Sequence, residues 1–191
     1  MKNLKSIKTI KILAILFISS LAFTACSDDD HDHDDDHDHE EELITTVTYT
    51  LKNGNDTVTL IFEDIDGEGG KAATQSISGP LTANTTYTGV IKLENATENP
   101  AEDITEEVKL EDDEHEFFYS SSVSGLAITK TDTDGNGNPL GIKTNLVTGA
   151  AGSGTITIVL KHEPTKPNNN TAANAGGSTD VDVTFTGITV Q

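Results

Sequence analysis

The sequence predicts an all-β fold, an antiparallel β-sandwich that is immunoglobulin-like in the loose sense, with one short helix, over residues 43–191. In several segments apolar residues alternate with threonine and other polar residues, and this period of two is typical of half-buried strands. Clusters of glycine, proline, asparagine and aspartate separate these segments and favour turns. The strands do not alternate with helices, as the strands of a parallel sheet would.

Alternation defines four strands, and the last of them carries an irregularity. The four segments are Val47–Leu51, Val58–Phe62, Ile156–Leu160 and Val181–Phe185. At Gly187 the phase of alternation slips, which predicts a β-bulge. Further strands are expected at Tyr87–Leu93, His115–Ser121, Gly125–Thr131 and Leu140–Thr148. A total of about seven to nine strands suits a sandwich.

One segment between these strands is expected to be helical. Asn99 is a suitable cap, and Pro100 suits the first turn. Ile104 and Val108 are four residues apart and would face the core. The helix should be short and end near Glu111.

Residues 1–25 are typical of a lipoprotein signal peptide. Lysines precede an uncharged run over residues 12–25, which is shorter than the roughly 20 residues that a membrane-spanning helix needs. Ala25 comes directly before Cys26, the only cysteine, as in a bacterial lipobox. We therefore expect cleavage before Cys26 and lipidation of its sulfur, so that the lipid anchors the protein to a membrane.

Residues 26–42 are expected to form a disordered tail that follows the lipidated cysteine. Every residue from Asp28 to Glu42 is aspartate, glutamate or histidine, so the segment has nothing apolar to bury. Paired histidines beside carboxylates favour capture of zinc or a similar divalent metal. The candidate ligands are His31, His33, His37, His39, Asp32 and Asp38. The alternative is a solvated acidic spacer and export signal.

Composition excludes several classes of function. The net charge of −20 argues against a nucleic-acid partner, because phosphate neutralisation needs a basic surface. The chain has no GxSxG elbow, no HExxH motif and no phosphate-binding loop. An enzyme is therefore not expected.

Two acidic loops are candidates for calcium binding. Asp132, Asp134 and Asn136 match the first ligand positions of an EF-hand loop, but Lys143 stands where the final glutamate is expected. A second loop begins similarly and offers Asp64, Asp66 and Glu68. Both segments are equally suitable as plain hairpin turns.

Two histidines of the predicted domain offer a further metal site. His115 lies between Glu114 and Glu116, and His162 precedes Glu163 at the end of a strand. These groups would form a metal site if the fold brought them together. The alternative is that each histidine is structural.

Four segments resemble a family of Bacteroidota lipoproteins often labelled "type 1 periplasmic binding fold superfamily protein". They are residues 41–47, 64–69, 93–100 and 114–118. The resemblance implies a surface lipoprotein, and the acidic run after Cys26 resembles the signal for transfer to the cell surface. It also makes an outer-membrane TonB-type uptake receptor a plausible partner. The label implies two α/β lobes, whereas the residues favour a single β domain.

These features together predict a lipid-anchored, non-enzymatic protein of the outer membrane, exposed at the cell surface or facing the periplasm. Its tail would capture a zinc-like metal, in support of metal uptake. The alternative is a binding or structural module for a polymer or a partner protein. That alternative predicts a groove or an exposed aromatic patch built from residues such as Tyr87, Phe117 or Tyr119.

Overall fold

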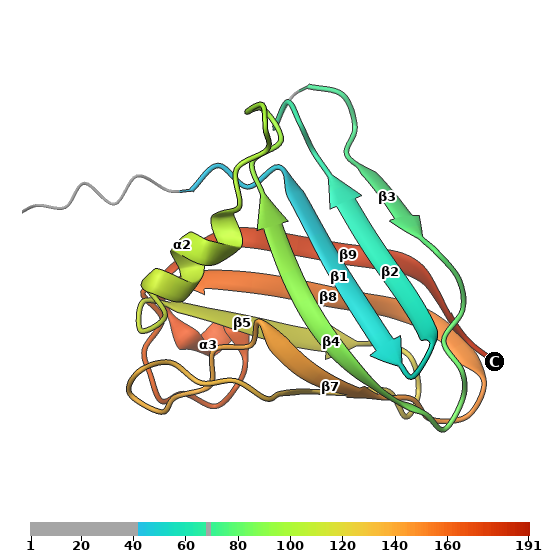
Figure 1. Ribbon diagram of the computed structural model, residues 1–191. Coiled ribbons are helices and arrows are strands. Elements are labelled where there is room, and N and C mark those ends of the chain that lie inside the picture. Colours follow the sequence, from blue (N-terminus) through green and yellow to red (C-terminus); the bar gives the residue numbers. More distant parts are fainter. Residues whose placement is uncertain (1–41, 68–69) are drawn as a thin grey trace, which may run out of the picture. The chain divides into compact units, whose positions relative to one another are not determined.

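The computed structural model describes residues 42–67 and 70–191 (Figure 1). The predicted signal peptide, Cys26, the six candidate ligands of the tail and Glu68 lie outside the described residues. None of the helices that the described residues form is long and apolar enough to cross a membrane.

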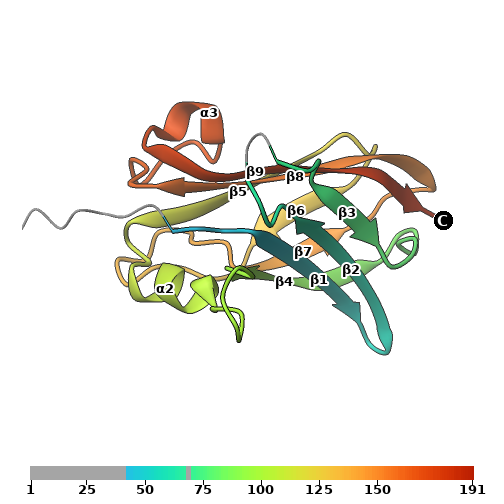
Figure 2. The ribbon, with the colours of Figure 1, turned by 90° about the horizontal axis from the view of Figure 1, so that it is seen from above.

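The described residues form two antiparallel sheets, which confirms the predicted sandwich. The larger sheet has six strands in the order β3 (Thr74–Ile77), β2 (Asp56–Glu63), β1 (Thr46–Asn53), β4 (Thr86–Glu94), β7 (Lys143–Val147) and β6 (Ala127–Lys130). The smaller sheet has three strands in the order β5 (His115–Ser121), β8 (Gly152–His162) and β9 (Ser178–Val190). Figure 2 shows the two sheets as stacked layers, with the strands of the smaller sheet above β1, β4 and β7.

The core lies between the two sheets and follows the predicted alternation. Tyr49 and Tyr87 contribute from the larger sheet, and Phe117 and Phe185 from the smaller one, all with no exposed surface. The tyrosine hydroxyls keep polar partners, because Tyr87 donates a hydrogen bond to Asp56 and the Tyr49 hydroxyl lies 2.7 Å from that of Thr144. The apolar side of each strand is therefore the side that packs against the opposite sheet.

The predicted helix is present but begins later than expected. Helix α2 spans Ile104–Leu110, and its cap is Asp103, whose side chain accepts a hydrogen bond from the Thr105 amide. The cap is therefore not Asn99, because an aspartate directly before the apolar residues satisfies a free amide of the first turn. Ile104 and Val108 are buried as predicted.

Two short elements escaped the sequence analysis. Strand β3 has only four residues, and its side chains are mostly exposed, so it carries no alternation signal. Helix α3 (Ala172–Ala175) lies within residues 164–177, which the sequence marked only as a turn region. Strand β8 also begins earlier than expected, at Gly152 within the glycine-rich segment.

Strand β9 contains two register irregularities, and one of them is the predicted bulge. Thr155 pairs with Thr186 while Gly154 pairs with Ile188, which leaves Gly187 unpaired with a φ of 79°. The second irregularity falls between Leu160 and Lys161 of β8, whose partners are Val181 and Thr179. The residue skipped on β9 is Asp180. A bulge re-aims a side chain, and here the side chain concerned is that of Asp180.

Candidate metal centre

The sandwich brings His115 and His162 together. They are directly opposite residues of the antiparallel pair β5 and β8, so both side chains project from the same face of the smaller sheet. The two rings are stacked, with centroids 4.8 Å apart and planes 10° apart. Both residues are buried. The condition on which the sequence made this metal site depend, that the two histidines lie together, is therefore met.

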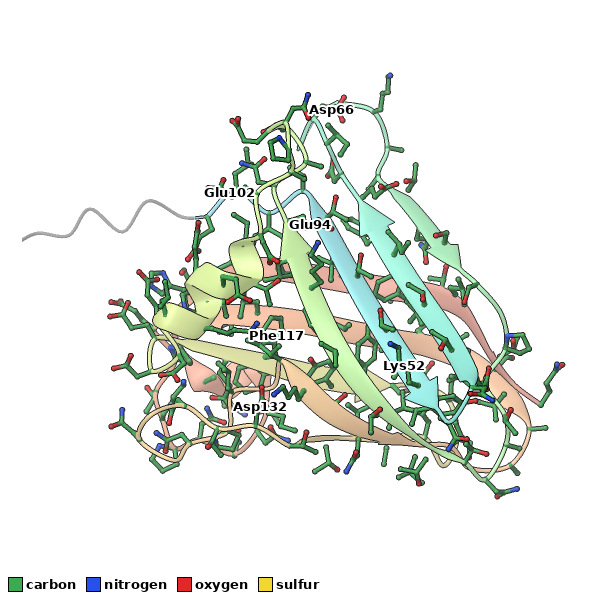
Figure 3. All side chains as sticks on the ribbon, viewed as in Figure 1. Lys52, Asp66, Glu94, Glu102, Phe117 and Asp132 are labelled. Atoms are coloured by element: carbon green, nitrogen blue, oxygen red, sulfur yellow. The ribbon has the colours of Figure 1, made fainter. Side chains whose placement is uncertain are left out.

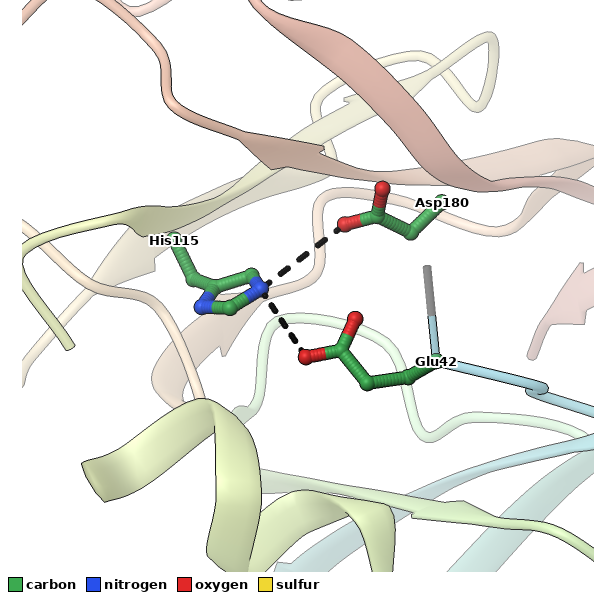
Figure 4. Close-up of side chains that lie close together, drawn as sticks. All are labelled: Glu42, His115 and Asp180. Carbon is green, nitrogen blue, oxygen red and sulfur yellow. Dashed lines mark ion pairs between the residues drawn. The ribbon is translucent and has the colours of Figure 1, made fainter. Parts of the chain in front are cut away.

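Two carboxylates face His115 at the same end of the sandwich. The His115 Nε2 atom lies 3.5 Å from Oε1 of Glu42 and 3.9 Å from Oδ2 of Asp180 (Figure 4). One ligand atom from each of the three residues lies within 4.8 Å of the other two. We call Glu42, His115 and Asp180 the inner group.

The backbone orients the imidazole of His115 toward these carboxylates. Its Nδ1 atom lies 3.0 Å from the carbonyl oxygen of Glu111, in the turn between α2 and β5. A carbonyl only accepts hydrogen bonds, so Nδ1 carries the proton, and in the neutral ring the lone pair of Nε2 points at the carboxylates. A histidine that ligates a metal is commonly oriented in this way by a carbonyl on its other nitrogen.

The bulge of β9 supplies Asp180. Val181 and Val183 point inward, so on a regular strand Asp180 would point outward, as Asp182 does. The skipped pairing position turns it inward instead, and its side chain is only 1% exposed. Bulges are frequent beside functional sites for this reason.

Glu42 reaches the inner group from the segment that precedes β1. This segment is held at Thr45, whose amide donates a hydrogen bond to the carbonyl of Glu94 and whose hydroxyl accepts one from the amide of Ala96. The side chain of Glu42 is 11% exposed. Glu42 is thus part of the folded domain, not of the tail to which the sequence assigned it.

His115 and Glu42 each hold a buried polar atom that receives no hydrogen bond from the described residues. These atoms are Nε2 of His115 and Oε2 of Glu42. If the ring is protonated, Nε2 forms an ion pair with each carboxylate, at a distance longer than that of a good hydrogen bond. Tetrahedral zinc, with bonds of about 2.0–2.1 Å, places neighbouring donor atoms about 3.3 Å apart. The 3.5 Å between His115 and Glu42 is close to that spacing, whereas the 3.9 Å between His115 and Asp180 is longer.

Further carboxylates lie near Glu42 at this end of the domain. Burial raises the pKa of Glu107 on α2, and the charges of Glu102, Glu42 and Glu111 raise it further. Because three carboxylates are among the causes, they contribute a negative electrostatic potential at Glu107, and Glu42 is one of the three. Such a potential raises the local concentration of cations.

A second set of ligand atoms adjoins the inner group. Nε2 of His162 lies 3.4 Å from Oε2 of Glu114, and a carboxylate oxygen of Glu163 completes a set within 4.8 Å. We call Glu114, His162 and Glu163 the outer group, because Glu163 is exposed and the Glu114 side chain is 37% exposed. Glu116, the other glutamate considered with these histidines, faces away from both groups and pairs with Lys130 and Asn168.

In the first predicted calcium loop, the aspartate carboxylates already interact with other groups of the protein. The carboxylate of Asp132 accepts hydrogen bonds from the amides of Gly141 and Lys143. Asp134 is buried and lies 3.1 Å from the Lys166 ammonium. Burial alone would raise the pKa of Asp134, but hydrogen bonds from Asn138 and the charge of Lys166 lower it overall.

The carboxylates of the other calcium loop also accept backbone hydrogen bonds. Asp64 accepts one from the amide of Gly67, and Asp66 one from that of Lys71. Figure 3 shows Asp66 and Asp132 far apart, at different ends of the domain. Asn136 is exposed. These contacts favour plain turns, and calcium binding at either loop stays a prediction.

The aromatic residues proposed for a partner surface do not form one. Tyr87 and Phe117 have no exposed surface. Tyr119 is partly buried, its ring packs near Tyr49 and Phe117, and its hydroxyl donates a hydrogen bond to the carbonyl of Gly141. The expectation of an exposed patch at these positions was wrong, because all three belong to the core side of their strands.

Comparison of the chain with protein-family models, with curated proteins and with solved structures finds no match. The resemblance to Bacteroidota lipoproteins therefore stays a prediction. The function has to be inferred from the donor atoms that the fold brings together.

Proposed function

We propose that this protein is a lipid-anchored, non-enzymatic surface protein that captures a zinc-like divalent metal, and that its folded domain contributes a metal centre at the inner group. One observation carries the proposal: the buried Nε2 of His115 faces the carboxylates of Glu42 and Asp180 without a hydrogen bond from any described residue. A divalent cation between these atoms would give Nε2 of His115 a partner.

The donor set favours zinc and similar transition metals. One imidazole nitrogen and two carboxylate oxygens match the mixed ligands that zinc accepts. Magnesium and calcium prefer oxygen ligands throughout, so the imidazole argues against them. Three protein ligands leave a fourth position for water.

The burial of the inner group favours binding of a metal ion over catalysis by that ion. The His115 side chain has no exposed surface, and Asp180 has almost none. A metal held there would have little room for a substrate beside its water ligand. The role we infer is therefore retention of the ion.

The anchor and the tail extend this function. Lipidation at Cys26 would hold the domain at the outer membrane, and the histidines of the tail would concentrate metal near it. Delivery to a TonB-type uptake receptor would be the consequence for the cell. In this proposal the tail binds with modest affinity and the inner group with higher affinity, because the fold has already ordered the inner group.

Calorimetric titration with zinc tests this proposal on the mature chain. A variant with His31, His33, His37 and His39 all replaced by asparagine should keep a binding event of high affinity. Adding Asp180→Asn to that variant should abolish it, whereas adding Asp182→Asn should not, because Asp182 is an exposed carboxylate on the same strand. Absence of zinc binding in the tail variant would contradict a metal centre in the domain.

A further inference from the structure

We propose that this end of the sandwich holds two divalent ions rather than one, the second at the outer group of Glu114, His162 and Glu163. The inference rests on the proposed function of the inner group and extends it. It assigns the outer group the role of a solvent-accessible site beside the buried one.

The outer group has the geometry of a metal site in its own right. Nε2 of His162 and Oε2 of Glu114 are 3.4 Å apart, close to the spacing of about 3.3 Å expected for two donor atoms bound to tetrahedral zinc. The His162 side chain is only 9% exposed, so the imidazole is held within the protein. The carboxylates supply the two remaining ligand atoms from the open side.

The backbone fixes these residues relative to one another. The amide of Glu163 donates a hydrogen bond of 2.6 Å to the carbonyl of Glu114, so the two ligand-bearing residues are tied together. Glu163 has a φ of 52°, a left-handed conformation that is uncommon for glutamate. Gly177 closes over this turn, since a Cβ atom there would lie 2.0 Å from the carbonyl oxygen of His162. The outer group is therefore preorganised.

The balance of charge favours two ions over one. The inner and outer groups together hold four carboxylates and two imidazoles. The two imidazoles are the stacked rings of His115 and His162. Lys166 approaches this region, because its ammonium contacts the carbonyl of His115, but that ammonium is paired with Asp134. Two divalent ions carry a formal charge equal and opposite to that of the four carboxylates.

The two positions differ in their access to solvent, and this difference sets the order of exchange. Glu163 is exposed and the Glu114 side chain is 37% exposed, whereas the side chain of His115 is fully buried. An ion at the outer group should therefore exchange quickly with solvent. The ion at the inner group should exchange slowly, because one or more of its ligands must first move.

The experiment counts zinc ions in the full mature chain whose four tail histidines are replaced by asparagine. Native mass spectrometry at saturating zinc should find two ions for each chain. Glu163→Gln changes an exposed side chain and should leave the fold intact, yet it should weaken one of the two binding events by about tenfold or more. Glu98→Gln, at an exposed loop position, is the matched control and should keep both ions.

The outcomes separate this inference from the proposed function. One tightly bound ion that is lost with Asp180→Asn and unaffected by Glu163→Gln and by His162→Ala would overturn the outer site and leave the inner centre standing. No bound ion in the parent chain would overturn both. A fast and a slow phase of zinc release to a chelator, with only the fast phase lost in Glu163→Gln, would support the proposed order of exchange.

Discussion

Asp180→Asn should change the stability of the domain in opposite directions with and without metal. The carboxylate of Asp180 has an oxygen within 4.8 Å of one from Glu42, and both side chains are buried. With both groups charged, their repulsion at 4.8 Å is about 3.5 kcal/mol at an effective dielectric constant of about 20. Without metal, the substitution should therefore raise the free energy of unfolding, by less than this repulsion because Asp180 also has a contact with His115 to lose.

With zinc present, the order of stabilities should reverse. A ligand at about 100 times its Kd stabilises the native state by about 2.7 kcal/mol. For a domain of this size, about 2.7 kcal/mol raises Tm by about 5–11 °C. The parent chain should gain this increment, and Asp180→Asn should gain little of it.

Circular dichroism during thermal unfolding, with zinc and with a chelator, measures both effects. The tail histidines should be replaced by asparagine in every sample, so that only the domain contributes binding. Asp182→Asn should behave as the parent does in both conditions. Equal destabilisation of Asp180→Asn with zinc and with chelator would refute the reasoning, because the role of Asp180 would then be structural.

Three further predictions concern other parts of the chain. The pKa of Asp134 is lower in the folded protein than in the unfolded chain, where it is about 4, so ionised Asp134 stabilises the fold above that pH. This contribution should be lost as the pH falls below about 4. Lys166→Met should reduce the loss, measured as the difference between the free energies of unfolding in urea at pH 7 and pH 3. Gly177→Ala should destabilise the domain by more than about 1 kcal/mol in the same assay, because the new Cβ atom would overlap the carbonyl oxygen of His162. Mass spectrometry of the protein from its native host should find a diacylglyceryl group on Cys26, and an unmodified thiol would contradict the anchor.

The sequence predicted the parts of the fold and site that depend on regular geometry. Alternation identified the strand that ends at His162, and a further strand was expected at His115–Ser121. The two histidines are paired residues of these strands, so both rings project from the same face of the sheet. The glycine at 187 revealed its bulge through a visible slip of that phase. These features depend on local periodicity, which a single sequence carries.

The remaining ligands depend on irregularities that leave no periodic signal. Asp180 continues the alternation of polar residues with Val181 and Val183, so nothing in the pattern reveals the skipped pairing position that turns it inward. Glu42 ends an uninterrupted acidic run and was therefore assigned to the tail. Its burial depends on a long-range contact with β5, and the sequence around Glu42 gives no sign of that partner.

The most direct test of the central claim is the anomalous diffraction of zinc in crystals of the metal-loaded chain. We predict an anomalous peak about 2.0–2.1 Å from Nε2 of His115, within bonding distance of carboxylate oxygens from Glu42 and Asp180. A zinc-loaded crystal with no peak between these three residues would contradict the account.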